Sequence, residues 1–294
     1  LNRDLPEEER IPLIEKFRKM YETMDFYVLY NRFLKKEGYQ TLPRRPLEKR
    51  KLRYEDVYPV LYLKYRLSRQ AERSNIKHLV IDEMQDYSRL QYLIIRRMFS
   101  CKMTILGDRA QTMADQQQDV LQFLPGIFGK DLRRIEMRKS YRNTVEIASY
   151  AANLIGVTDL ELFERHGMPV LERDVSDLEA ALREAVDTLF PDEKTYETAA
   201  VIVPDEKTAE RAYLILREIL AEKDFDCGKR LSWLNRDSSS FKKGLTVTTF
   251  YLAKGLEFDQ VVSIFPKDEK REMMMQAQYI AATRALHELR VYHI

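Results

Sequence analysis

Glycine and cysteine are both scarce in this chain of 294 residues, which has nine glycines and two cysteines. Cys101 and Cys227 are too few for a disulfide framework or a cysteine-bound zinc cluster, so we interpret them as free thiols in a reducing compartment. No apolar run approaches the roughly 18 residues that a membrane-spanning helix requires. The acidic start, LNRDLPEEER, is not a signal peptide. These absences predict a cytoplasmic protein that does not bind membranes.

An excess of charge of either sign is also missing, because 49 basic residues offset 47 acidic ones and leave a net charge of +2. Bulk attraction to nucleic acid is thereby excluded, so any nucleic-acid site must be local. The basic run between Arg44 and Arg53 is a local candidate, although such a run is more often a solvated face. Hydrophobic residues make up 45% of the chain, which is ample for a core, and the length predicts two domains.

The first 75 residues have apolar positions at helical spacing, which predicts helices over Glu7–Leu34 and from Tyr54 to about Arg73. The chain then alternates short apolar runs with helical segments, a pattern typical of parallel sheets covered by helices. The predicted fold is therefore α/β, with two small sheets that divide near Glu136. The expected strands are His78–Ile81, Met103–Leu106, Leu132–Met137, Ala199–Val203, Leu245–Phe250, Gln260–Phe265 and Leu289–His293.

The segment LVIDEMQD, Leu79 to Asp86, is the strongest local signal. Three apolar residues predict a buried strand, and Asp82 and Glu83 follow at its carboxyl end, the edge where open α/β sheets bind ligands. One carboxylate could hold the Mg²⁺ that bridges nucleotide phosphates, and the other could orient the attacking water. Taken alone, the segment is equally compatible with an ordinary strand that ends in solvated acids.

Two further segments place polar residues beside predicted strands. TILGDRAQ ends a strand with Asp108, and Gln111 follows at a distance from which it could reach a phosphate or a water. KSYRNTVEIASYA places Tyr141 and Arg142 at a strand-to-helix junction. An arginine there can meet negative charge on a phosphoryl group, and a tyrosine can stack on a base. A turn and a helix start are the ordinary structural readings of these segments.

The last two segments lie near the end of the chain. VTTFYLAKGLEFDQVV predicts two strands around a loop that contains Gly255 and Glu257, and the glycine permits a close backbone approach or a positive φ. QYIAATRALHELRVY predicts a helix with Arg284 near its end, followed by a strand. Arg284 could equally be a cation that stabilises the helix C-terminus.

In this order and spacing, the five segments closely resemble motifs II to VI of superfamily 1 helicases of the UvrD/Rep kind. DEMQD is similar to motif II, GDRAQ to motif III, SYRN to motif IV, KGLEFD to motif V and YIAATRA to motif VI. The resemblance runs from about His78 to the end and implies RecA-like sheets of the P-loop NTPase type. Residues 1–136 would be the remainder of a first unit with a helical insertion, and residues 137–294 a complete second unit.

The resemblance also implies an ATPase of the DNA helicase type, with ATP and Mg²⁺ bound between the two units. It gives a role to ten residues: Asp82 as the Mg²⁺ ligand, Glu83 as the catalytic base, Gln85 and Gln111 near the γ-phosphate, Tyr141 stacked on adenine, Arg142 and Arg284 as arginine fingers, Glu257 near the ribose or phosphates, and Asp108 and Gly255 as further cofactor-binding residues.

A narrower similarity is to the HelD-type branch, which implies action on bacterial RNA polymerase. HLVIDEMQDYSRLQ, TILGDRAQ and SYRNTVEIASYA carry it, together with the close spacing between Asn143 and Lys254, where Rep and UvrD insert a large subdomain. Thr112–Asp119 also lacks the aromatic residues with which Rep-like enzymes stack on single-stranded DNA, an interaction worth about 1–3 kcal/mol per base. RNA polymerase is therefore the expected partner, and DNA is a second candidate.

The phosphate-binding pattern GxxxxGK[ST] occurs nowhere in the chain, and GIFGK at Gly126–Lys130 has the wrong spacing. Without that loop the main-chain cradle, its lysine and the Mg²⁺-binding hydroxyl are missing. We expect a fragment cut between this loop and motif II, which by itself binds ATP weakly or not at all. The alternatives are a DNA-unwinding Rep/UvrD-like helicase and a non-enzymatic interaction module with a vestigial ATP site.

Overall fold

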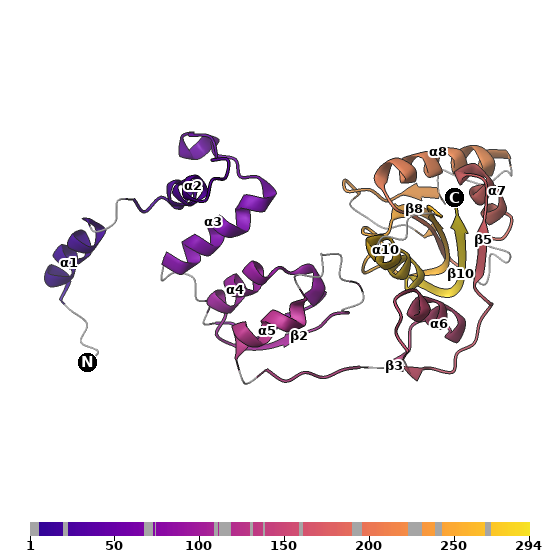
Figure 1. The fold of residues 1–294 in the computed structure, drawn as a ribbon, viewed down its shortest axis with the longest axis horizontal. Coiled ribbons are helices and arrows are strands. Elements are labelled where there is room, and N and C mark those ends of the chain that lie inside the picture. The colour runs from indigo at the N-terminus through magenta and orange to yellow at the C-terminus, as the bar shows by residue number, and fades with distance from the viewer. Residues whose placement is uncertain are drawn as a thin grey trace. The chain divides into compact units, whose positions relative to one another are not determined.

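The computed structural model describes residues 6–19, 23–67, 73, 75–108, 111, 119–129, 132–137, 139–158, 161–189, 196–222, 231–238, 243–267 and 272–294. The chain divides into two compact units (Figure 1). Each unit has hydrophobic clusters of its own. Unit 1 comprises residues 1–107 and 114–132, and unit 2 comprises residues 108–113 and 133–294. None of the described helices is long and apolar enough to cross a membrane.

Unit 1 begins with three helices, α1 (Glu7–Lys19), α2 (Phe26–Lys36) and α3 (Tyr54–Leu67). The single helix expected over Glu7–Leu34 is wrong, because Asp25 starts a new helix by accepting hydrogen bonds from the main-chain N–H groups of Tyr27 and Val28. Pro59 lies inside α3. The expected continuation of α3 over residues 68–72 lies outside the described residues.

The basic run between α2 and α3 is held by ion pairs within unit 1. Arg50 bonds Asp25 at 2.7 Å, and Arg53 bonds the buried Asp56 at 2.7 Å. The hydrogen bond from Arg50 lowers the pKa of Asp25. Asp56 also accepts from the Tyr30 hydroxyl at 2.8 Å, and burial together with this carboxylate raises the pKa of Tyr30 to about 12. Two of the cations in the run therefore stabilise the fold.

The rest of unit 1 is built around a pair of parallel strands, because β1 (His78–Ile81) pairs with β2 (Lys102–Ile105). The short 3-10 helix η3 (Met84–Asp86) and the helices α4 (Arg89–Met98) and α5 (Val120–Phe128) complete the unit. The buried residues of the core that these elements form are Ile81, Tyr92, Val120 and Leu124, and a second buried cluster of unit 1 consists of Tyr27, Tyr30, Leu34 and Leu42. The segment GIFGK is no phosphate loop, because Gly126 lies inside α5 and Gly129 ends that helix with a φ of +81°.

Unit 2 is built on a six-stranded parallel sheet in the order β5-β10-β9-β6-β8-β7. This confirms the α/β class. Strands β3 and β4 form a separate parallel pair and precede the sheet in the sequence. The strands are β3 (Lys139–Ser140), β4 (Glu161–Leu162), β5 (Leu171–Asp174), β6 (Thr198–Val203), β7 (Leu231–Trp233), β8 (Gly244–Thr249), β9 (Phe258–Phe265) and β10 (Ala285–His293). The helices are α6 (Val145–Leu154), α7 (Leu178–Val186), α8 (Glu206–Glu222) and α10 (Glu272–Ala282).

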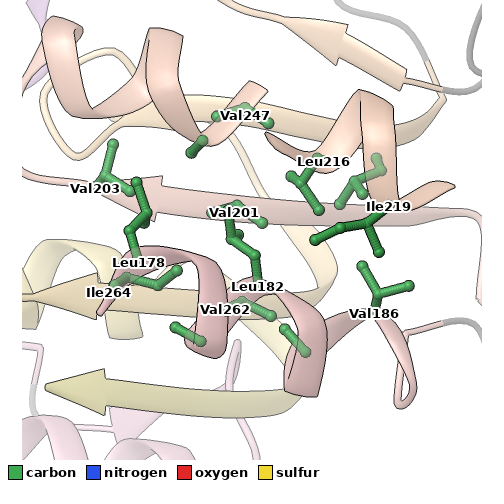
Figure 2. Packing of buried hydrophobic residues seen from close by; sticks show 14 of the residues in the cluster. Leu178, Leu182, Val186, Val201, Val203, Leu216, Ile219, Val247, Val262 and Ile264 are labelled. Carbon is green, nitrogen blue, oxygen red and sulfur yellow. The ribbon is translucent and has the colours of Figure 1, made fainter. Parts of the chain in front are cut away.

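Helices cover both faces of this sheet, so its central strands are apolar on both sides (Figure 1). Along β6, Ala199, Val201 and Val203 pack with α7 and α8, whereas Ala200 and Ile202 pack with α6 and α10. Figure 2 shows the first of these two cores, where the leucines of α7 and α8 meet the valines of the sheet. The two-sided burial explains why the strand appears in the sequence as an unbroken apolar run.

The expected strand at Leu132–Met137 is wrong, since these residues have no strand assignment. Its alternate side chains find no core: Ile135 is 86% exposed and Met137 is 87% exposed. The strand in this region is the two-residue β3, which starts at Lys139. Four strands were not expected from the sequence, namely β3, β4, β5 and β7, and each has four residues or fewer.

Leu216 of α8 gives a test of the core of unit 2. We expect Leu216→Ala to lower the free energy of unfolding by about 2–5 kcal/mol, because the side chain is fully buried. Leu214→Ala on the same helix is the control: its side chain is 45% exposed, and we expect a change below about 0.5 kcal/mol. Urea unfolding followed by the fluorescence of Trp233, the only tryptophan of the chain and a residue packed on this core, measures both. Equal losses would contradict the packing described here.

Candidate functional site

The acidic pair predicted at the carboxyl end of β1 lies there, with Asp82 exposed and Glu83 half-buried. Glu83 has a left-handed backbone, φ 51° and ψ 51°, and is the only residue other than glycine with a positive φ in the described part of the chain. This conformation costs an L-residue roughly 1–2 kcal/mol. Such strain persists where the surroundings impose it, and it concentrates at functional sites.

The surroundings of Glu83 fix it from two sides. The Met84 N–H donates to the carbonyl oxygen of Leu106 at 2.8 Å, and the buried Gln85 donates from Nε2 to Oε2 of Glu83 at 2.5 Å. A Cβ at Gly107 would lie 2.5 Å from the Gln85 Oε1 and 2.6 Å from the Met84 main-chain nitrogen. Position 107 therefore admits only glycine, because the end of β2 passes directly against the turn that carries Glu83.

Asp82 and Glu83 have the donor chemistry that suits Mg²⁺. This ion usually binds through one or two carboxylates, with the remaining ligands supplied by substrate phosphates and water. No cluster of three or more His, Cys, Asp or Glu residues capable of holding a metal occurs in the described ranges. The pair therefore fits a Mg²⁺ ion that arrives with a phosphate group.

In unit 2, the predicted residues collect at the amino ends of β9 and β10. Glu257 precedes β9 directly, and its Oε1 pairs with the Arg142 Nε at 2.7 Å. Arg142 is 45% exposed and lies at the junction between β3 and α6, as predicted. Gly255, in the loop before Glu257, has the positive φ that the sequence indicated, at +77°.

Arg284 lies between α10 and β10 and is only 2% exposed. Its Nε donates to the Ile280 carbonyl oxygen at 3.3 Å, its Nη1 to that of Leu256 at 3.4 Å, and its Nη2 to the Gln111 Oε1 at 3.5 Å. The first bond gives a hydrogen-bond partner to a carbonyl group in the last turn of α10. Arg284 thus has the contact expected of a cation that stabilises a helix C-terminus, the alternative role given to it from the sequence. The third bond brings Arg284 together with a second predicted site residue.

Gln111 and Asp108 extend this contact into a chain of hydrogen bonds within unit 2. Gln111 Nε2 donates to Asp108 Oδ2 at 2.9 Å, and the Tyr279 hydroxyl donates to the same oxygen at 3.0 Å. Burial, and then the charge of Asp108, raise the pKa of Tyr279, while the charges of Arg284 and Arg142 act in the opposite direction. Sequence reasoning missed Tyr279, although it lies in the same QYIAATRA segment as Arg284.

Tyr141 presents an exposed ring, as stacking on a base would require. The ring lies 5.5 Å from that of Phe163 with an interplanar angle of 39°. The Lys139 Nζ lies 5.5 Å from the centroid of Tyr141 and 5.8 Å from that of Phe163. Phe163 was not predicted, because it comes from a short loop after β4 that has no strand or motif signal.

Some of the sequence interpretations concern residues outside the described ranges. They include residues 112–118, most of the segment without aromatic residues, and Cys227. Among the described residues, the structure brings together Glu83 with Gln85 in unit 1, and Arg142 with Glu257 and Arg284 with Gln111 in unit 2.

The first part of the chain is similar to a helicase family. The model of the UvrD/REP helicase N-terminal domain matches residues 2–113, a range that contains Asp82, Glu83 and Gln111. The match covers less than half of the chain, so it shows a similarity to UvrD/REP helicases over that range. A search of curated proteins found no match.

Several solved helicase structures are distantly similar. The C-terminal domain of a possible DNA helicase from Lactobacillus plantarum WCFS1 is 24% identical, with a TM-score of 0.41 over 53% of this chain and 88% of that one. The helicase of PRRSV is 17% identical, with a TM-score of 0.41 over 74% and 35% of the two chains. Arterivirus nonstructural protein 10, a helicase, is 14% identical, with a TM-score of 0.38 over 72% and 38%. These similarities are too distant to assign roles to residues.

Gly107 provides a test of the turn that carries Glu83. We expect Gly107→Ala to destabilise this turn, because the new methyl group would overlap the Met84 main chain. Gly126→Ala is the matched control, since a Cβ there meets nothing within 4 Å and alanine favours the helix by roughly 0.5–1 kcal/mol. Hydrogen–deuterium exchange of the peptide over residues 78–86 should accelerate in the first variant only. Unchanged exchange would contradict the close approach.

Glu146 makes the free energy of unfolding of unit 2 depend on pH in the acid range. Its carboxylate accepts from the His166 Nδ1 at 3.0 Å and from the Gly167 N–H at 2.9 Å, and these bonds lower its pKa to about 2. A carboxyl group whose pKa is lower in the folded state stabilises the fold fully at pH values above its unfolded-state pKa, near 4.5. This contribution is lost as the pH falls through the folded-state pKa.

We therefore expect the stability difference between the wild type and Glu146→Gln to shrink as pH falls from about 5 toward about 2. Urea unfolding monitored by Trp233 fluorescence between pH 7 and pH 3 measures it. A difference that does not change over this range would show that these hydrogen bonds do not favour the ionised carboxylate.

Proposed function

We propose that this chain is part of an ATP-driven motor of the superfamily 1 helicase kind, which couples hydrolysis of Mg²⁺-ATP to remodelling of RNA polymerase or to movement on DNA. The observation that carries the proposal is the Asp82–Glu83 pair at the carboxyl end of β1. Its two carboxylates lie at the kind of sheet edge where ligands bind, and Glu83 is held there in a left-handed backbone conformation. Both residues also lie within the range that matches the UvrD/REP helicase model.

In the proposed reaction, Asp82 would hold Mg²⁺ through a carboxylate oxygen, and the ion would offset negative charge on the phosphate oxygens. Glu83 accepts the proton of the attacking water. Gln85 holds the carboxylate of Glu83 through its 2.5 Å hydrogen bond and so fixes the direction in which the base points. Gly107 maintains this turn by leaving room for the Gln85 side chain.

The arginines of unit 2 have different tasks in this proposal. Arg142 exchanges its exposed partner Glu257 for a phosphoryl oxygen, because a pair of exposed charges is worth only about 0–1 kcal/mol and a phosphate can bind arginine through two oxygens. Arg284, with Gln111, stabilises negative charge that develops on the phosphoryl group. Asp108 and Tyr279 orient Gln111, and Tyr141 with Phe163 provides a surface on which adenine stacks.

Remodelling of RNA polymerase is the form of the motor that the sequence favours. The short interval between Asn143 and Lys254 leaves no room for the large subdomain of unwinding enzymes, and Thr112–Asp119 has no aromatic residue to grip single-stranded DNA. Retention of RNA polymerase on the immobilised gene product, together with ATP turnover that single-stranded DNA does not stimulate, would support this form. ATP turnover that single-stranded DNA stimulates, together with separation of DNA strands, would instead support the DNA-unwinding helicase.

A non-enzymatic interaction module is a second candidate, and one observation favours it. The chain contains no GxxxxGK[ST] segment, and that segment supplies the main-chain groups and the lysine that hold the nucleotide phosphates. In this case the acidic pair and the arginines would be retained for the fold alone. Binding of a fluorescent ATP analogue to the whole gene product separates the two candidates, because a module would not bind it.

Glu83→Gln is the direct test of the proposed reaction. We expect kcat for ATP in the whole gene product to fall by about 10²- to 10⁴-fold, because the amide cannot accept the proton from water. Binding of ATP should persist, since the substitution leaves the rest of the phosphate site in place. Glu37→Gln, a change at the exposed end of α2, is the control for removal of one negative charge. Equal turnover in the two variants would remove Glu83 from the mechanism.

A further inference from the structure

The main chain around Arg284 is tied to the β3–α6 junction by the side chain of Asn143. Its Nδ2 donates to the carbonyl oxygens of Thr283, at 3.3 Å, and Ala285, at 2.6 Å. These acceptors are the two neighbours of Arg284. Asn143 itself follows Arg142 directly and is buried. The buried Asn143 amide therefore links the main chain beside Arg142 to the main chain beside Arg284.

Arg165 makes a second connection between the same two segments. Its Nη2 donates to the carbonyl oxygen of Arg142 and, at 2.6 Å, to that of Leu286. Leu286 lies where the pairing of β10 with β9 shifts in register, between Ala285 and Glu288. An irregularity of this kind leaves main-chain groups outside the regular ladder. Arg165 therefore bonds the chain at Arg142 to the start of β10, two residues after Arg284.

The loop that carries Arg165 is held closely in turn. The Val145 N–H donates to the Arg165 carbonyl oxygen at 2.9 Å, and the Gly167 N–H donates to Glu146 at 2.9 Å. A Cβ at Gly167 would lie 2.7 Å from Cγ2 of Thr144 and 3.2 Å from the His287 carbonyl oxygen. The loop is thus enclosed between the start of α6 and β10, and Arg165 has little freedom to follow a movement of only one of them.

We propose that Asn143 and Arg165 are positioning residues that make Arg142 and Arg284 one rigid pair, so that both arginines approach the phosphoryl group together. This inference rests on the proposed function, in which both arginines act on that group. The four cross-linking hydrogen bonds end on main-chain carbonyl oxygens, so they fix the chain and leave the guanidinium groups of Arg142 and Arg284 to other partners. Neither positioning residue needs to touch the nucleotide.

The first arm of the test measures the connection in the absence of nucleotide. We expect Asn143→Ala to accelerate hydrogen–deuterium exchange both in the peptide around residues 283–286 and in that around residues 140–146. Gln260→Ala is the matched control: it also removes a buried amide that donates a hydrogen bond in unit 2, in this case to the Glu288 carboxylate at 2.9 Å, and this bond involves neither arginine nor the main chain beside them. Acceleration confined to one of the two segments, or equal in the two variants, would overturn the rigid pair.

The second arm measures turnover by the whole gene product. We expect Asn143→Ala and Arg165→Ala to lower kcat by about 10- to 100-fold per folded molecule, because small displacements of catalytic groups have effects of this size. The KM for ATP should change little. Arg165→Lys, which keeps one donor and the charge, should restore part of the loss, and Gln260→Ala should keep the wild-type kcat. A purely structural role would lower the melting temperature in Asn143→Ala and Gln260→Ala alike without separating their kcat values.

The two ideas fail in different ways. If Arg142→Ala and Arg284→Ala abolish turnover but Asn143→Ala matches Gln260→Ala, the positioning role is overturned and the proposed function stands. If the wild-type product has no turnover while the exchange of the two segments remains coupled, the proposed function is overturned, and with it the positioning role.

Discussion

The parallel pairing of β9 with β10 is the constraint on which the arrangement of unit 2 depends. Phe258 pairs with Ala285, and the Phe258 N–H donates to the Arg284 carbonyl oxygen at 2.9 Å. Glu257 and Arg284, each immediately before its strand, therefore come to the same edge of the sheet. That edge holds the amino ends of the strands, whereas in unit 1 the acidic pair follows the carboxyl end of β1. The polar residues of the two units thus occupy opposite kinds of sheet edge.

Burial divides the polar residues of unit 2 into fixed and exchangeable groups. Arg284 is removed from water, and it donates hydrogen bonds to carbonyl oxygens, to the Thr283 hydroxyl oxygen and to Gln111. A buried cation is costly unless it is hydrogen-bonded, so we expect its position to be well defined. Arg142 and Glu257 form an exposed pair that solvent weakens. The same edge of the sheet therefore combines a cation that is held in place with one that can change partners at little cost in free energy.

The sequence predicts the central strands of unit 2 well because their signal is local. β6 is an apolar run whose end at Val203 agrees with prediction, and β8 and β9 are buried where strands are expected. β1 ends at Ile81 as predicted, but the expectation of a buried strand there is wrong, because Val80 is 60% exposed. Edge strands such as β5, LERD, have no such run, because most of their side chains face solvent. At Leu132–Met137 an apolar pattern exists without a core to receive it. The helix start at Asp25 was missed because a capping residue was read as part of a longer amphipathic pattern.

For the candidate site, motif spacing predicted which segments carry polar residues at strand ends, and the structure agrees for Glu83, Arg142 and Glu257. Their roles stay predictions. Residues that act through long-range contacts gave no signal. Asn143 bonds residues more than a hundred positions away, and Arg165 lies in a loop without a motif. Such contacts depend on how β10 returns beside the β3–α6 junction, which no local pattern in the chain encodes.

Release of phosphate from ATP by the whole gene product, measured with and without Mg²⁺, distinguishes a motor from a protein without ATPase activity. We expect hydrolysis that saturates with ATP and disappears when Mg²⁺ is removed, because the acidic pair can hold a phosphate group only together with the ion. Absence of hydrolysis at every ATP concentration, with Mg²⁺ present and the protein folded, would show that the protein is not an ATP-driven motor. The acidic pair and the arginines would then be features of an inherited fold that has no motor activity.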